Sequence, residues 1–140
     1  MTDIETAVKN LEGHSLCLCR EGEFFTDDGR GISPMMRFIS EGRDLSGYSA
    51  ADVIVGKAAA MLFVKAGIKE VYGRVMSEAA KEYLESRGIP LGFTTLTDRI
   101  INRQGTDICP MEKAVAEISD PEEGYAALKA KLEELRSRNN

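Results

Sequence analysis

The residues most suited to chemistry lie between positions 101 and 112. Pro110 predicts the first turn of a helix, which places Cys109 at its N-cap and Glu112 at its third position. A thiol at a helix N-terminus meets free backbone N–H groups, which favour the thiolate, and Arg103 would add to this effect if the loop folds back. Cys109 is therefore a candidate nucleophile or redox centre. The alternative is that it replaces serine as a weak helix cap.

A second group of candidates lies in the apolar run 52–67, which we interpret as a central buried helix. Glycine inside a helix costs about 1 kcal/mol relative to alanine, so either close packing or room for a ligand should explain Gly56. Lys57 would either extend to solvent or face an anionic group. Asp52 stands where a carboxylate can cap the predicted helix. The candidate ligand-binding residues are Asp52, Gly56, Lys57, Asn102, Arg103 and Glu112.

Two further stretches carry weaker signals. Cys17 and Cys19 would point to the same face of a strand and, with His14 nearby, could suggest a metal. The chain has one histidine and no C-x-x-C pair, so the cysteines are better interpreted as core residues, and we predict no metal and no cofactor. The loop 27–34 contains Arg30 between two glycines. It could hold a phosphate or a carboxylate, or it could be an ordinary connection.

The elements that must position these residues follow from hydrophobic spacing and from helix caps. Helices are expected at 2–12, 33–42, 52–67, 78–87, 109–118 and 121–137, and strands at 15–19, 23–26, 69–76 and 91–96. Residues 98–101 could extend the last strand or form a further short one. A hairpin followed by alternating helices and strands predicts an α/β domain with a mixed sheet covered on both faces.

Composition limits the class of protein. A chain of 140 residues with 43% hydrophobic and 29% charged residues predicts one globular domain over 1–140. Its net charge of −5 argues against nucleic acid as a partner. No apolar run is long enough to predict a membrane span. Three cysteines do not form a disulfide framework, which indicates a reducing, cytoplasmic setting.

Three stretches together, 52–60, 101–106 and 109–115, resemble an uncharacterised prokaryotic domain family with a cytidine deaminase-like fold. The resemblance implies a three-layer α/β/α sandwich with a mixed sheet. Zinc deaminases carry H-x-E or C-x-E on the central helix and P-C-x-x-C on the next helix. Lys57-Ala58-Ala59 and Ser77-Glu78-Ala79-Ala80 stand at about these places and offer no zinc ligand. The resemblance therefore implies the fold without zinc-dependent deamination.

Three functions remain open from the sequence. The first is a binding domain for an anionic or nucleotide-like small molecule, held in the deaminase-like cleft. The second is an enzyme or redox-responsive protein that uses Cys109. The third is a structural or interaction module, in which the charged helix 121–137 could support a homo-oligomer, although its leucines equally fit packing on its own domain.

Overall fold

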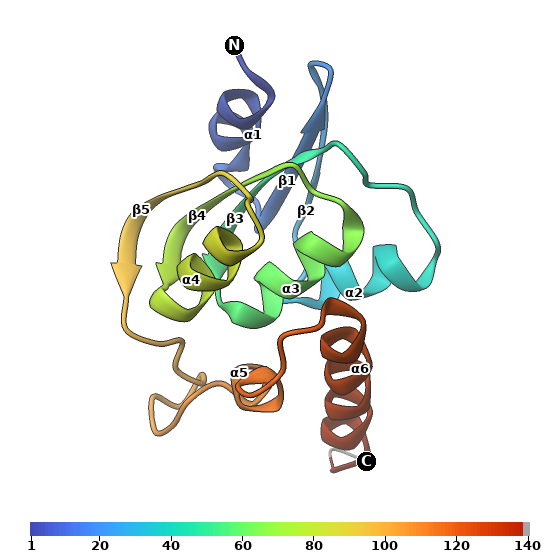
Figure 1. The fold of residues 1–140 in the computed structure, drawn as a ribbon, viewed down its shortest axis with the longest axis vertical. Coiled ribbons are helices and arrows are strands. Elements are labelled where there is room, and N and C mark those ends of the chain that lie inside the picture. Colours follow the sequence, from blue (N-terminus) through green and yellow to red (C-terminus); the bar gives the residue numbers. More distant parts are fainter. Residues whose placement is uncertain (139–140) are drawn as a thin grey trace.

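The computed structural model describes residues 1–138, which form a five-stranded mixed sheet with helices on both faces (Figure 1). The strand order is β2-β1-β3-β4-β5, in which β1 is antiparallel to both of its neighbours while β3, β4 and β5 run parallel. The strands are β1 (Leu16–Arg20), β2 (Glu23–Asp27), β3 (Ser49–Val55), β4 (Glu70–Ser77) and β5 (Leu91–Thr97).

The helices divide unequally between the two faces of the sheet. The helices are α1 (Asp3–Leu11), α2 (Ser33–Ser40), α3 (Lys57–Ala66), α4 (Glu78–Ser86), α5 (Pro110–Val115) and α6 (Pro121–Arg138). Among the helices of residues 1–138, α1 packs on one face, above a small cluster that includes Cys17, Cys19 and Ala51. The larger core lies on the other face, where α3 is in contact with α2, α4, α5 and α6. The predicted α/β class with a mixed sheet is therefore confirmed.

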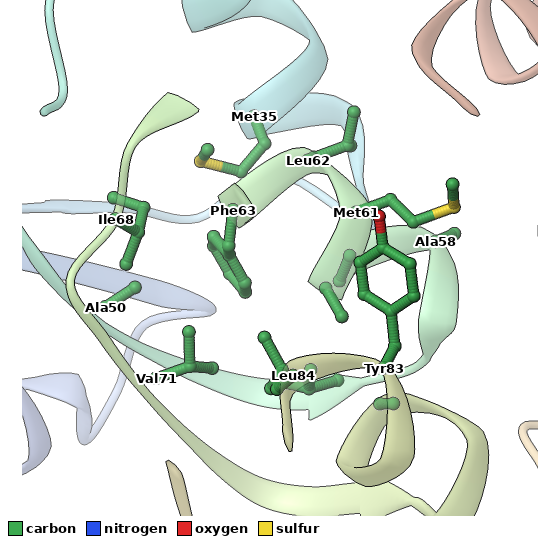
Figure 2. Packing of buried hydrophobic residues seen from close by; sticks show 14 of the residues in the cluster. Met35, Ala50, Ala58, Met61, Leu62, Phe63, Ile68, Val71, Tyr83 and Leu84 are labelled. Carbon is green, nitrogen blue, oxygen red and sulfur yellow. The ribbon is translucent and has the colours of Figure 1, made fainter. Parts of the chain in front are cut away.

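Helix α3 lies at the centre of the larger core. Its residues 58–63 are all buried, and Phe63 is fully enclosed. Figure 2 shows Phe63 directed toward Ala50 and Val71 of the sheet, with Leu84 of α4 nearby. Both small alanines and larger side chains of α3 are therefore enclosed, because the sheet lies on one side of this helix and other helices lie on its remaining sides. The prediction of a central buried helix is correct for this segment.

Local sequence signals explain where several helices begin and end. The Thr2 hydroxyl accepts a hydrogen bond from the Glu5 backbone N–H, and the Glu5 side chain accepts one from the Thr2 N–H. The Ser77 hydroxyl caps α4 by accepting a hydrogen bond from the Ala80 backbone N–H. Helix α3 ends at Gly67, which adopts the left-handed conformation that favours glycine. These boundaries agree with the predictions within one or two residues.

The prediction of a helix over 52–67 is wrong at its start. Residues 52–55 belong to β3, Gly56 is the N-cap, and α3 begins at Lys57. The β-branched run Val53-Ile54-Val55 favours a strand, and the extended backbone of Gly56 separates it from the alanines. Asp52 is therefore a strand residue rather than a helix cap, and Gly56 does not lie inside a helix.

Smaller differences concern α2 and the segment after β5. The N-cap of α2 is Ile32 instead of Ser33. Residues 98–101 form no strand and make one bridge, between Ile101 and Ile108. Helix α5 ends at Val115 instead of about residue 118, and Cys109 occupies its N-cap without a side-chain hydrogen bond.

Helix α6 packs on its own domain. Its Leu128 is fully buried in the larger core, and Leu132 and Leu135 pack against that core. Asp120 caps it by accepting a hydrogen bond from Glu123 N at 3.0 Å. The apolar stripe of this helix therefore packs on its own domain, which is one of the two alternatives that the sequence leaves open. No helix within residues 1–138 combines the length and the apolar character that a membrane crossing requires.

The substitution Leu128→Ala should lower the free energy of unfolding by about 2–5 kcal/mol, because it removes a fully enclosed side chain. Lys129→Ala, at an exposed position of the same helix, is the matched control and should change it by less than about 0.5 kcal/mol. Urea unfolding followed by circular dichroism measures both. Equal free energies of unfolding for the two variants would contradict the packing of α6 on the core through Leu128.

Candidate functional site

A cleft of about 1020 Å³ lies where the carboxyl end of β3 meets the segment after β5. Figure 1 shows the arrowheads of β4 and β5 directed toward the side on which α5 lies. The walls come from the end of β3, the start of α3, the loop 28–33, the segment 100–104, the start of α5 and the last part of α6. The volume is at the upper end of the range of roughly 300–1,000 Å³ that is common for small-molecule sites.

Glu112 joins α5 to α3 at the edge of this cleft. Its carboxylate accepts hydrogen bonds from the backbone N–H groups of Lys57 at 2.8 Å and Ala58 at 2.9 Å. These are free donors at the first turn of α3, where the helix dipole also favours a negative charge. Gly56, the N-cap residue, has no side chain that could accept hydrogen bonds from these N–H groups. A Cβ atom at this position would lie 2.6 Å from the Glu112 carboxyl carbon. Close approach of this carboxylate is therefore the reason for glycine at position 56.

Asp52 is the buried polar residue of the cleft. Its exposed fraction is 9%, and Ala51 and Val53 on either side belong to the α1 face, so the carboxyl group points to the opposite face with the cleft. Within residues 1–138 no side chain pairs with it, and Ile54 N is 3.4 Å from Oδ1, which is long for a hydrogen bond. Burial raises its pKa to about 7, because the ionised form loses hydration, and backbone N–H groups oppose this only in part.

The rim of the cleft carries charged and polar side chains. Arg30 and Arg103 are both exposed, and neither has an ion-pair partner in the described part of the chain. His14 Nδ1 lies 2.6 Å from Asp28 Oδ1. Asn102 organises its own loop, since Oδ1 accepts from Thr106 N at 3.0 Å. The rim therefore offers two guanidinium groups to an anion, above a largely apolar interior.

The structure brings most of the predicted site residues together. The cleft is lined by Asp52, Gly56, Asn102, Arg103, Cys109 and Glu112. Lys57 is separate from them: it lines a smaller hollow of about 500 Å³ beside α4, and its Nζ donates to Ala116 O at 3.1 Å. The capping interaction expected for Glu112 also differs, because its carboxylate caps α3 and not its own helix.

Two walls of the cleft were not assigned to it from the sequence. Leu132 and Leu135 of α6 face it, although their spacing indicates only an amphipathic helix. The sequence of the loop with Arg30 is only a weak signal for an anion site, and the structure places Arg30 and Arg103 in the lining of the same cleft. No local pattern connects these segments, because they meet only through the fold.

The three cysteines occupy different surroundings. Cys17 and Cys19 are fully buried, and burial raises the pKa of both thiols, that of Cys17 to about 11. Cys109 is partly exposed at the cleft. Across residues 1–138, no three His, Cys, Asp or Glu side chains lie close enough to form a metal-binding group. His14 pairs with Asp28 and not with a cysteine.

Comparison with known proteins agrees with this architecture. The family model TM1506, described as "Domain of unknown function (DUF1893)", matches residues 6–132. The chain belongs to the DUF1893 family. A crystal structure of a DUF1893 family protein (TM1506) from Thermotoga maritima aligns with a TM-score of 0.83 and 25% identity, over 94% of this chain and 91% of that chain. No curated protein matches the sequence.

The contact between Gly56 and Glu112 can be tested by a double-mutant cycle. Gly56→Ala should destabilise the protein by about 1–3 kcal/mol, because the new methyl group displaces the carboxylate. Glu112→Ala should cost about 0.5–2 kcal/mol, because it leaves two N–H groups of α3 without their acceptor. Urea unfolding gives all four free energies of the cycle.

In the Glu112→Ala background, the added cost of Gly56→Ala should fall by more than half, because the group that the methyl meets is gone. Strict additivity of the two substitutions would contradict the interpretation of Gly56 as the space for Glu112. The extended backbone of Gly56 is accessible to alanine, so conformational strain does not confuse the comparison.

The buried carboxyl group of Asp52 should make stability fall as pH rises. Its pKa is about 7 in the folded chain against 3.8 ordinarily, so between these values the folded state holds a proton that the unfolded state has lost. The loss is at most about 1.4 kcal/mol per pH unit. Asp52→Asn should gain stability over the parent between pH 5 and pH 8, as measured by urea unfolding.

Asp107→Asn is the control for this measurement. Asp107 is exposed, and hydrogen bonds from Lys113 and Ile108 lower its pKa, so it is ionised in both states throughout pH 5–8. Its substitution should leave the pH dependence unchanged. A parent protein whose stability is level over this range, or which matches Asp52→Asn at each pH, would refute the raised pKa.

Proposed function

We propose that the cleft binds a nucleotide-like small molecule, with the planar part of the ligand inside and its anionic group at the rim. The observation that carries the proposal is Asp52, a carboxyl group nine-tenths buried in an open cleft without a side-chain partner. Burying a carboxyl group with only weak backbone contacts is costly, and a ligand that offers hydrogen-bond donors would compensate this cost.

The walls of the cleft support the same class of ligand. Its interior is formed mainly by aliphatic side chains, which suit the face of a heterocycle: Ile54, Ala58, Ala59, Ile100, Met111, Leu132 and Leu135. Arg30 and Arg103 at the rim suit a phosphate, because one guanidinium group can donate two parallel hydrogen bonds to two phosphate oxygens. Lys57 is not part of this proposal, since its side chain leaves toward the smaller hollow.

Zinc-dependent deamination is not part of the proposal either. A cytidine deaminase-like fold is supported by the order of elements, in which a hairpin precedes the parallel strands β3–β5 and helices α3 and α4 follow β3 and β4. The helix starts at Lys57-Ala58-Ala59 and at Ser77–Ala80 nevertheless supply no histidine or cysteine for the metal. We infer that the fold is related while the chemistry is not.

Binding can be measured by calorimetry with four ribonucleoside monophosphates and the matching nucleosides. At least one nucleotide should bind with a Kd below about 100 μM, and its nucleoside more weakly, because the arginines then lack a phosphate. The double variant Arg30→Ala/Arg103→Ala should lose this difference. Arg99→Ala, which changes an arginine of the smaller hollow, is the matched control and should behave like the parent.

Cys109 provides a second measurement of occupancy. It is partly exposed in the cleft while Cys17 and Cys19 are buried, so iodoacetamide should modify Cys109 first in the folded protein. A bound nucleotide should slow this modification by at least about fivefold, resolved by mass spectrometry. Absence of binding by all eight compounds at millimolar concentration would refute the proposed function.

A further inference from the structure

We propose that Asp52 selects the heterocycle of the ligand, and that the cleft takes a heterocycle of the guanine type, in which a ring N–H stands beside an exocyclic amino group. The inference rests on the proposed function and extends it from a class of ligand to a particular hydrogen-bonding edge. The two carboxylate oxygens of Asp52 would accept one hydrogen bond each from the two donors of that edge.

The acceptor geometry follows from the position of Asp52 in β3. Leu16 on β1 and Gly73 on β4 are its neighbours in the sheet, and neither has a polar side chain to pair with it. The backbone N–H groups of Ile54 and Val53 are the hydrogen-bonding groups near it, with Ile54 N at 3.4 Å from Oδ1, and a carboxylate oxygen has a second lone pair to offer. Asp52 therefore keeps accepting capacity on the side that faces the cleft.

The carboxylate at the edge of the cleft is already engaged in hydrogen bonds. Glu112 accepts from Lys57 N and Ala58 N, which uses one position on each of its oxygens and holds the group against α3. Asp28 is at the rim with His14. Of the acidic residues that line the cleft, Asp52 is therefore the buried one, and within residues 1–138 no side chain pairs with it.

The alternatives to a two-donor edge fit less well. Hypoxanthine has the ring N–H and lacks the amino group, so one carboxylate oxygen would stay unpaired in a buried place. Xanthine has a carbonyl where guanine has the amino group, and that oxygen would face a carboxylate oxygen. A site with one buried carboxylate should therefore prefer guanine over both, as polar sites reject ligands that leave them unpaired.

The experiment compares GMP, IMP and XMP by calorimetry at pH 8, with the full-length parent and with Asp52→Asn. The parent should bind GMP at least about tenfold more tightly than IMP or XMP. An asparagine amide presents one acceptor and one donor, which match the N–H and the carbonyl of xanthine. Asp52→Asn should therefore prefer XMP over GMP by a similar factor. Asp98→Asn, beside the smaller hollow, should keep the preference of the parent.

Each outcome has a distinct meaning. A reversed order of GMP and XMP in Asp52→Asn, with urea unfolding showing that the variant is folded, supports the assignment. Nucleotide binding without preference for GMP, or a preference unchanged by Asp52→Asn, overturns the inference and leaves the proposed function standing. No binding by any nucleotide overturns both. A pterin with the same two-donor edge, tested in parallel, shows whether the edge is read on a nucleotide or on another heterocycle.

Discussion

The contact between the Glu112 carboxylate and the first turn of α3 holds the candidate site together. It joins residues 54 and 55 positions apart in the chain at distances below 3 Å. Helix α5 has only six residues and little propensity to form alone, so this contact gives it a fixed place. The segment 98–109, which forms one wall of the cleft, is thereby attached at both ends, to β5 on one side and to α3 on the other.

The cap has a consequence for binding. The free N–H groups at the start of a helix are a common anion site, and in α3 the chain fills them with its own carboxylate. An anionic ligand must therefore find its positive partners elsewhere, and the exposed arginines of the rim are suited to that. The interior keeps an acidic group, Asp52. The cleft therefore favours hydrogen-bond donors of a ligand in its interior and the anionic group of a ligand at its rim.

Much of the fold could be predicted from local sequence, and the errors have a physical cause. Capping signals at Thr2, Ser77 and Asp120 locate three helices, because a cap depends on residues only a few positions apart. The run 52–67 predicts one helix although its first four residues form a strand, because a short apolar segment does not distinguish a buried strand from a buried helix by periodicity. The partner that explains Gly56 is 56 positions away, so no local pattern reveals it.

The same limit applies to the candidate site. Asp52 and Arg103 were chosen for their chemical type, and both line the cleft, whereas Lys57 points elsewhere because the strand extends to Val55 and sets the start of α3. In sheets with parallel strands, ligands bind outside the carboxyl ends of the strands, and the cleft lies there. A carboxyl group buried at that edge lowers stability above its pKa, and a fold under selection for stability alone would replace it with an apolar residue. Its position in an open cleft therefore favours a role in binding over a role in folding.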